Sequence, residues 1–344
     1  HFIAFIIKTL YFCSMQGVEI IKALCDNESL SIAQLSKLTG ASVPTVTKYL
    51  NDLLLKNWIS STGKLSGEHG RKASLYRICG QTAYFLGVDP KHHTLSMALM
   101  DLSGRIVCES DENLLFENTP EMIETICDKC ETFIDKSGVA REKVQFAAFN
   151  ISGRVNPASG QSHSIFNFEN NEDALSDTLS ERLGIKTLID NDTRLMAYGE
   201  MKTSLKDKFS DFLFINVGWG IGLSIIIDGK LYCGANGFSG EFGHTSVYDN
   251  EIMCHCGKKG CLETEVSGKA ICMHLQKRIA AGETSSLKGR IARGANLSEI
   301  DIINAALNDD MRDKQFKAQF WGGVMGPIMH NPSNISYALT AGIG

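Results

Sequence analysis

A histidine and three cysteines in one short segment restrict the fold of this chain more than any other feature. His244 is followed by Cys254, Cys256 and Cys261, at spacings of ten, two and five residues. One imidazole and three thiolates complete a tetrahedral ligand set, which is typical of structural zinc sites and leaves no position for catalytic water. The segment is therefore expected to close around a structural Zn²⁺. His255 is an alternative ligand, although its place between two cysteines makes the geometry crowded.

The cysteine count favours a reducing compartment. The chain has 344 residues and eleven cysteines, an odd number. Long chains with clustered cysteines do not resemble secreted disulfide scaffolds, and reduced thiols with a bound metal fit better. The apolar run Phe2–Phe12 is too short for a membrane span. It also lacks the flanking residues of a signal peptide. We therefore expect a cytoplasmic protein with no membrane partner.

Charge is distributed unevenly along the chain. Residues 1–80 hold nine Lys and Arg against five Asp and Glu, a net charge of +4, whereas the whole chain carries −5 and the remainder therefore −9. A basic N-terminal segment on an acidic body indicates an anionic partner for that segment alone.

Three short helices are predicted in the basic segment. Residues 17–24 have apolar side chains at helical spacing, and Ser31 is expected to cap a helix over 32–38 that Gly40 ends. Ser42 is expected to cap a third helix. The inner face of that helix is expected to carry Val43, Val46, Leu50, Leu53 and Leu54. With the tight turn at 39–41, this arrangement predicts a helix-turn-helix.

Two β-rich runs, 58–63 and 75–78, surround a glycine-rich basic tip and predict a wing. Small hydroxyls and cations suit contacts with DNA grooves and phosphates. The candidate DNA-binding residues are Ser42, Thr45, Thr47 and Lys48 on the third helix, and Arg71 and Lys72 at the tip. A helical protein-interaction module is the alternative, but the wing and the positive charge favour DNA binding.

The rest of the chain alternates strands with helices. Helices are expected at 120–136 and 173–183 and from 192 onward, and strands at 83–89, 94–100, 105–108, 144–151, 187–190, 212–217 and 223–227. This alternation predicts an α/β body with a largely covered sheet.

Two further groups of residues bear on ligand binding. Asp190-Asn191-Asp192 ends a predicted strand and opens a helix, where α/β proteins bind ligands, although Asp192 can equally serve as a helix N-cap. Gly218-Trp-Gly220-Ile-Gly222 allows close backbone approach to a phosphate, but hairpins use such glycines as well.

Three segments together carry a family resemblance. Glu241-Phe-Gly-His244, the cysteine cluster ending in Cys261-Leu-Glu263, and Asp190 to Glu200 resemble the signatures of the ROK family of repressors, uncharacterised reading frames and sugar kinases. The resemblance covers about residues 85–335. With the winged helix-turn-helix, it indicates the repressor branch.

The resemblance implies a two-lobed, actin-like fold of the ribonuclease H and sugar kinase type. The domains would be 1–80 for DNA binding, 81–205 for the first ROK lobe, and 206–344 for the second lobe with the zinc site. The sugar-binding residues carried over from the family are Asn191, Asp192, Glu241, His244 and Glu263. Carboxylates and an amide suit a polyol, which donates and accepts hydrogen bonds at once. His244 would place its other ring nitrogen on zinc.

One departure separates the chain from the family's kinases. Those enzymes carry Asp-x-Gly-Gly-Thr after the first strand to cradle ATP phosphates, whereas this chain has Asp89-Pro-Lys-His-His93. Proline has no N–H and fixes φ, so close backbone approach to phosphate is disfavoured. Asp192 would be catalytic only in the alternative function, an ATP-dependent sugar kinase.

The sequence therefore predicts a sugar-responsive transcriptional repressor that is not an enzyme. It would bind operator DNA as a homo-oligomer, a dimer or tetramer, because symmetric operators need paired recognition helices. A DNA-binding protein with a vestigial sugar site is a further alternative. The family continues for several tens of residues beyond Ile335, so the chain is expected to lack a terminal helix.

Overall fold

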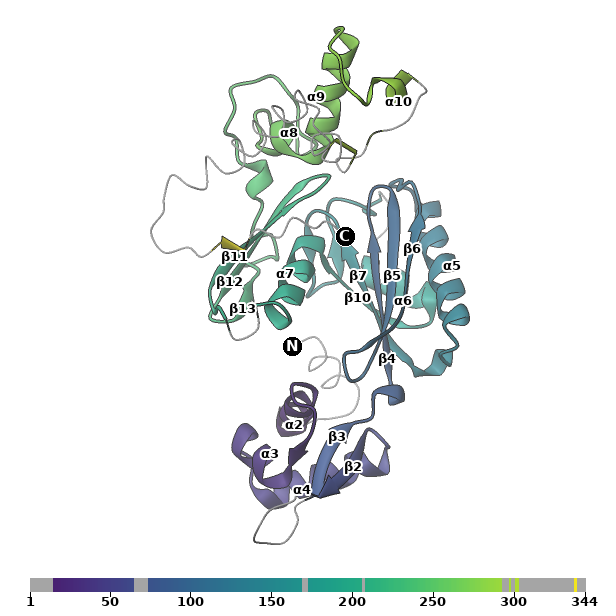
Figure 1. Ribbon diagram of the computed structural model, residues 1–344, viewed down its shortest axis with the longest axis vertical. Coiled ribbons are helices and arrows are strands. Elements are labelled where there is room, and N and C mark those ends of the chain that lie inside the picture. Colours follow the sequence, from purple (N-terminus) through teal and green to yellow (C-terminus); the bar gives the residue numbers. More distant parts are fainter. Residues whose placement is uncertain are drawn as a thin grey trace. The chain divides into compact units, whose positions relative to one another are not determined.

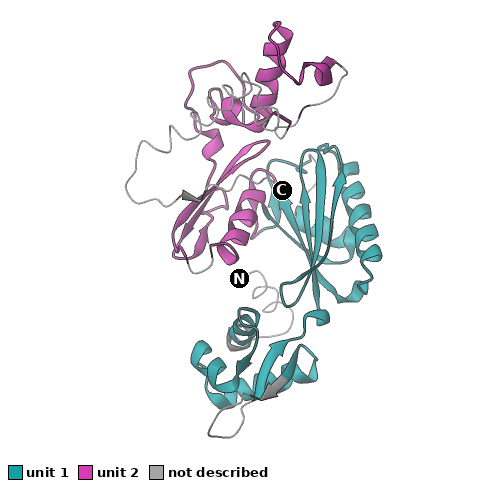
Figure 2. Ribbon diagram, viewed as in Figure 1, with its two compact units in different colours: residues 1–151, 159–190 teal, residues 152–158, 191–344 magenta. Residues whose placement is uncertain are grey.

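The structure, a computed structural model, describes residues 15–64, 74–168, 173–205 and 208–292, with 297, 301–302 and 337–338. The chain forms two compact units (Figure 2). The first comprises residues 1–151 and 159–190, and the second comprises residues 152–158 and 191–344. Within the described ranges, no helix combines the length and the apolar character needed to cross a membrane.

A winged helix-turn-helix opens the first unit and confirms the predicted fold class (Figure 1). Its elements are α2 (Met15–Cys25), β1 (Leu30–Ser31), α3 (Ile32–Thr39), α4 (Val43–Leu55), β2 (Ile59–Lys64) and β3 (Ser74–Ile78), with strand order β1-β3-β2. Ser31 and Gln34 form a capping box at the start of α3, and Gly40 ends that helix at φ 68°. Ser42 caps α4.

The inner face of α4 differs from the prediction at one residue. Val46, Leu50 and Leu53 are buried as expected, but Val43 is 51% exposed. Val43 is the first residue of α4 and lies beyond the apolar cluster that the later turns contact. Arg71 and Lys72, predicted at the tip of the wing, lie outside the described residues.

One apolar cluster serves both the helices of the winged helix-turn-helix and the sheet that follows them. Leu35, Leu50 and Trp58 belong to the same buried cluster as Phe85 and Phe146 of the sheet. A continuous core resists relative movement of the elements that share it, because interiors are close-packed.

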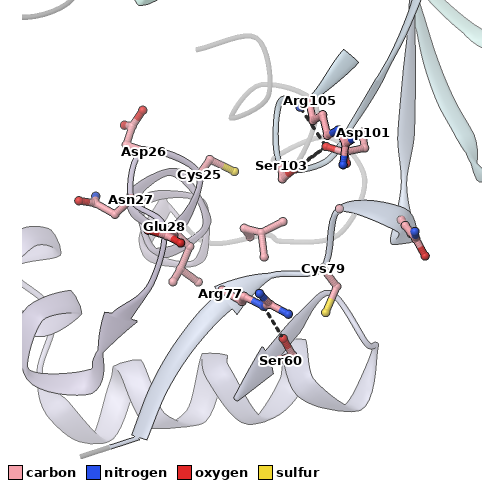
Figure 3. A pocket seen from close by; sticks show the side chains of 14 residues that line it. Cys25, Asp26, Asn27, Glu28, Ser60, Arg77, Cys79, Asp101, Ser103 and Arg105 are labelled. Carbon is pink, nitrogen blue, oxygen red and sulfur yellow. Dashed lines mark hydrogen bonds between the residues drawn. The ribbon is translucent and has the colours of Figure 1, made fainter. Parts of the chain in front are cut away.

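The connection between these two parts is short and tightly packed. Gly80 lies in η1 (Gly80–Thr82), and its carbonyl accepts a hydrogen bond from the Leu102 N–H at 3.1 Å. A Cβ atom at Gly80 would lie 2.4 Å from Asp101 Oδ2. Asp101 is itself fixed by hydrogen bonds from the N–H and hydroxyl of Ser103 and from the Arg105 N–H. Figure 3 shows the pocket of about 620 Å³ beside this connection.

A five-stranded sheet with order β10-β7-β4-β5-β6 forms the centre of the rest of the first unit. Its strands are β4 (Tyr84–Pro90), β5 (Thr94–Asp101), β6 (Ile106–Asn113), β7 (Val144–Ile151) and β10 (Lys186–Asn191). Strands β4, β5 and β6 pair antiparallel, and β4 pairs parallel with β7. Figure 1 shows α5 (Pro120–Ser137) beside this sheet. The unit also holds η2 (Arg141–Lys143), β9 (Gln161–Ser162) and α6 (Leu175–Leu183).

The prediction of a largely covered sheet is wrong for β6. No residue of this strand is buried, whereas every second residue of β5 is. β6 is an edge strand, and its acidic side chains Glu109, Asp111 and Glu112 keep it solvated.

The second unit is built around a sheet with order β13-β12-β11-β14. Its elements are β8 (Val155–Asn156), α7 (Asp192–Lys202), β11 (Phe212–Val217), β12 (Ile221–Ile227), β13 (Lys230–Tyr232), η3 (Phe242–His244), α8 (Glu263–Val266), α9 (Gly268–Ala280), α10 (Lys288–Ala292) and β14 (Tyr337–Ala338). Ala197 of α7 packs with Phe212 and Phe214 of β11.

The packing at Gly80 generates a stability prediction. We expect Gly80→Ala to lower the free energy of unfolding by about 1–3 kcal/mol, because the added methyl group overlaps the anchored Asp101 carboxylate. Gly87→Ala is the matched control, since its Cβ would meet only the Ala98 carbonyl at 3.8 Å. Urea denaturation measures both variants. Equal stability of the two would contradict the steric role of Gly80.

Candidate functional site

The predicted metal ligands lie together in the second unit. His244, Cys254, Cys256 and Cys261 present four ligand atoms that are all within 4.8 Å of one another. The Cys254 Sγ is 3.4 Å from His244 Nδ1, and the Sγ atoms of Cys256 and Cys261 are 3.6 Å apart.

The backbone of the loop brings these ligands together. The Gly257 N–H donates to the Cys254 carbonyl, which makes a tight turn between the first two cysteines. Gly260 has φ 73°, and a Cβ there would lie 2.0 Å from the Tyr248 carbonyl. Bridges join Ser246 with Cys261 and Met253 with Lys259. The close approach of Gly260 to Tyr248 therefore allows the following residue, Cys261, to lie beside the other three candidate ligands.

This donor set fits a tetrahedral ion. With Zn–S bonds of about 2.3 Å, two sulfur ligands on one zinc lie about 3.8 Å apart. The observed sulfur–sulfur distance of 3.6 Å is close to that value. His255 Nδ1 is 3.9 Å from Cys254 Sγ and also forms a second possible ligand group with His244 and Glu263.

His244 connects the cysteines to the carboxylates. Its Nδ1 faces Cys254, while its Nε2 lies 3.6 Å from Glu241 Oε2. Burial lowers the pKa of His244, against the opposing charges of Glu263 and Glu241. A neutral imidazole can use one nitrogen as a ligand and the other as a hydrogen-bond donor.

Glu263 is a fixed acceptor at the start of α8. Its Oε2 accepts the Ile221 N–H at 3.0 Å, and its Oε1 lies 3.2 Å from His255 Nδ1. Burial raises the pKa of the Glu263 carboxyl, but these two hydrogen bonds, together with the charges of His255 and His244, outweigh burial and leave the pKa lowered. The contact with Glu263 in turn raises the pKa of His255. The ionised form of Glu263 is therefore favoured. Sequence analysis did not predict its pairing with His255.

Asn191 and Asp192 form a second group at the start of α7. Asn191 is the N-cap, because its Oδ1 accepts the Arg194 N–H at 3.1 Å. The alternative N-cap role of Asp192 is therefore wrong. Asp192 Oδ2 accepts a hydrogen bond of 2.8 Å from the Ser152 hydroxyl, and the Asn191 amide donates to the Gly153 carbonyl. Sequence analysis did not predict these two contacts.

Strand β12 links the two groups. Gly222 packs against Thr193, the residue after Asp192, since a Cβ at Gly222 would lie 2.0 Å from Thr193 Oγ1. The preceding residue, Ile221, donates its N–H to Glu263. The glycine run forms a hairpin in which the Gly218 N–H donates to the Gly220 carbonyl.

The candidate DNA-binding side chains lie in the first two turns of α4. The Ser42 and Thr45 hydroxyls are 2.8 Å apart, and the Thr47 hydroxyl donates to the Val43 carbonyl. Ser42 and Lys48 are exposed, and Thr45 and Thr47 are half-buried. The three hydroxyls therefore stabilise their own helix as well as facing its outer side.

The segment that would hold ATP phosphates in a kinase is a closed hairpin turn. Pro90 pairs with Leu95, and the Lys91 N–H donates to the Thr94 carbonyl at 2.8 Å. Burial raises the pKa of Asp89, which lies 3.4 Å from the Lys91 ammonium.

Comparisons with known proteins agree with this arrangement. Residues 85–321 match the ROK family, and residues 18–60 match a winged helix-turn-helix DNA-binding family. The xylose repressor of Caldicellulosiruptor bescii is 26% identical over 291 residues, which cover 83% of this chain and 72% of that protein. The N-acetylglucosamine repressor of Escherichia coli O157:H7 is 28% identical over 243 residues, 70% of this chain and 59% of that protein.

Two solved structures share the fold. The crystal structure of a ROK family transcriptional regulator, a homologue of the E. coli MLC protein, has a TM-score of 0.73 at 24% identity, covering 91% of this chain and 78% of its own. A ROK family glucokinase from Streptomyces griseus, in complex with glucose and AMPPNP, has a TM-score of 0.57 at 24% identity, covering 71% and 79%. Because the family match spans well over half of the residues, this chain belongs to the ROK family, with a winged helix-turn-helix at its N-terminal end.

Proposed function

We propose that this protein is a sugar-responsive transcriptional repressor. The observation that carries the proposal is the presence in one chain of a winged helix-turn-helix and, in the second unit, two polar groups: Glu241 with His244, and Asn191 with Asp192. The similarity to proteins named xylose repressor and N-acetylglucosamine repressor supports it. The ligand would be a monosaccharide or its derivative.

The sugar would be held by the five predicted residues of the second unit. Glu241 and Glu263 accept hydrogen bonds from hydroxyls, His244 donates through Nε2, and Asn191 and Asp192 bind from the start of α7. Carboxylates that already have fixed hydrogen-bond partners within the protein lose little conformational freedom when a ligand binds. The hydrogen bond from Ile221 to Glu263 and that from Ser152 to Asp192 support this role.

A structural Zn²⁺ would be held by His244, Cys254, Cys256 and Cys261. The ion would supply rigidity, because four protein ligands complete its coordination. His244 is both a proposed metal ligand and a proposed sugar-binding residue. It is the last residue of η3, three positions after Glu241. Bracing the loop therefore also fixes the direction of the Glu241 carboxylate.

The winged helix-turn-helix would bind operator DNA. Ser42, Thr45, Thr47 and Lys48 would contact the groove and its phosphates, with Arg71 and Lys72 on the backbone. The protein would act in the cytoplasm as a dimer or tetramer. Residues 1–80, 81–205 and 206–344 would be its functional domains.

Phosphoryl transfer is not part of the proposed function. The turn at 90–94 has a proline where the family's kinases have glycines, and the Lys91 N–H is bonded to Thr94. The missing N–H at Pro90 and the bonded N–H at Lys91 make this turn a poorer phosphate cradle than a glycine loop. Asp192 can still bind a sugar hydroxyl as a hydrogen-bond acceptor.

Zinc content tests the metal assignment. Purified protein is expected to hold about one zinc per chain, and Cys256→Ser to hold less, because a serine hydroxyl does not ionise to replace the thiolate. Cys108→Ser, in β6, is the control and is expected to keep its zinc. Retention should also fall on dialysis below neutral pH, since the ligands then take up protons. Elemental analysis measures all three; undiminished zinc in Cys256→Ser would refute the assignment.

Sugar affinity tests the carboxylates. We expect Glu263→Ala to weaken the sugar bound by the wild type by about 1–3 kcal/mol, roughly 5- to 150-fold, because a buried hydrogen bond is left unpaired. Glu241→Ala is expected to act similarly. Glu251→Ala, an exposed residue of the same loop that pairs with Lys259, should leave affinity unchanged. Titration calorimetry at constant zinc content makes the comparison, and wild-type affinity in Glu263→Ala would exclude Glu263 from the site.

Operator affinity with and without sugar tests the whole proposal. Saturating sugar is expected to change operator affinity about 5- to 150-fold, a coupling of about 1–3 kcal/mol. Asp192→Asn should bind DNA normally and lose the response. Lys48→Ala should weaken DNA binding and leave sugar affinity intact. The assay is fluorescence anisotropy at fixed salt, with DNA selected by the wild type from a random pool.

Two outcomes would contradict this scheme. A wild-type operator affinity that does not respond to saturating sugar would refute the switch, even if both ligands bind. Loss of DNA binding by Asp192→Asn would mean that Asp192 maintains the fold instead.

A further inference from the structure

Arg194 is a buried cation two residues beyond Asp192. Its exposed fraction is 3%, and it is the only buried Arg or Lys in the described part of the chain. Removing a guanidinium from water is costly, so its hydrogen bonds must compensate. Its position beside Asp192 and the free-energy cost of burying its charge together indicate a specific role for this side chain, beyond its place in α7.

The guanidinium joins two loops that are distant in the sequence. Its Nη1 donates to the carbonyl of Gly237, and its Nη2 donates to the carbonyl of Val155 at 2.9 Å. The two loops also touch directly, because a Cβ at Gly237 would lie 2.9 Å from the Val155 carbonyl. Gly237 has φ 79°, a conformation that glycine adopts without strain.

Each of these three segments carries, leads to or contacts a candidate sugar-binding residue. The Val155 segment contains Ser152, whose hydroxyl donates to Asp192. The Gly237 loop leads within four residues to Glu241. The backbone N–H of Arg194 donates to the Asn191 side chain. One side chain therefore fixes the distances between the segments that present Asp192 and Glu241.

We propose that Arg194 is a positioning residue of the sugar site. It contacts no sugar itself, but holds the 152–158 segment and the 234–241 loop against the start of α7. The planar guanidinium has donors that point to two acceptors at once, which the single ammonium of lysine does not reproduce. This inference rests on the proposed sugar site for its functional consequence, whereas its structural part stands on the contacts alone.

The test compares three variants by two measurements. Arg194→Met removes the donors at similar length, Arg194→Lys keeps the charge, and Arg141→Met is the control, an arginine that donates to the Leu183 carbonyl in the first unit. The first measurement is hydrogen–deuterium exchange in peptides covering 152–158, 234–241 and 254–261. The second is calorimetry with the sugar that most stabilises the wild type among D-xylose, D-glucose and N-acetyl-D-glucosamine.

We expect Arg194→Met to speed exchange in the first two peptides but not in 254–261, with zinc content unchanged. Its sugar Kd should rise about 10- to 100-fold, because small misplacements of binding groups are costly. Arg194→Lys should be intermediate, and Arg141→Met should match the wild type. A general loss of packing would speed exchange in all three peptides, so this selectivity distinguishes positioning from a merely structural role.

Unchanged exchange at 152–158 and 234–241, or an unchanged sugar Kd where the wild type binds, would overturn the inference. If Arg194→Met does not fold, Arg194→Lys decides by the same two measurements. If the wild type binds none of the sugars and Glu263→Ala has no effect, the proposed function fails, and exchange alone then decides whether Arg194 holds the two loops.

Discussion

The apolar core shared by the DNA-binding helices and the five-stranded sheet is the constraint on which the rest of the first unit depends. Trp58 and Leu50 are buried with Phe85 and Phe146, so the winged helix-turn-helix has no separate core. Gly80 lies so close to Asp101 that the connection between the two parts has no room for even a β-carbon at this position. Helix α4 therefore shares its packing with the sheet, and a change in its direction would disturb this common core.

The chain passes between the two units at residues 151–152, 158–159 and 190–191. Ser152 directly follows the first of these crossings, and Asn191 and Asp192 follow the last. The Ser152 hydroxyl donates to Asp192, and the Asn191 amide donates to the Gly153 carbonyl. A ligand on Asp192 would therefore act on residues adjacent to the crossings. A sugar can shift the balance between two arrangements only through a difference in its affinity for them, and residues at a crossing are well placed to supply that difference.

Local signals predicted the elements, and long-range contacts escaped prediction. Caps at Ser31 and Ser42 and the stop at Gly40 involve residues within a few positions, and the structure has all three. The close grouping of His244 with the three cysteines was predictable because all four residues lie within 18 positions of one another. By contrast, Ser152 is 40 residues from Asp192, and Arg194 is 43 from Gly237. No periodicity or spacing encodes such pairs, nor does it encode the exposure of Val43.

The glycines at and just before the start of β12 illustrate why a sequence pattern alone does not reveal what its glycines do. Glycines at 218, 220 and 222 are compatible with close approach of a phosphate or with a hairpin. Here the space beside them is taken by side chains: Thr193 lies over Gly222, and Glu263 Oε2 lies 2.8 Å from where a Cβ of Gly220 would be. Glycine therefore serves to admit a carboxylate to the Ile221 N–H. An anionic group at that N–H disfavours a second anion and favours a neutral ligand rich in hydroxyl donors, which is the chemistry of a sugar.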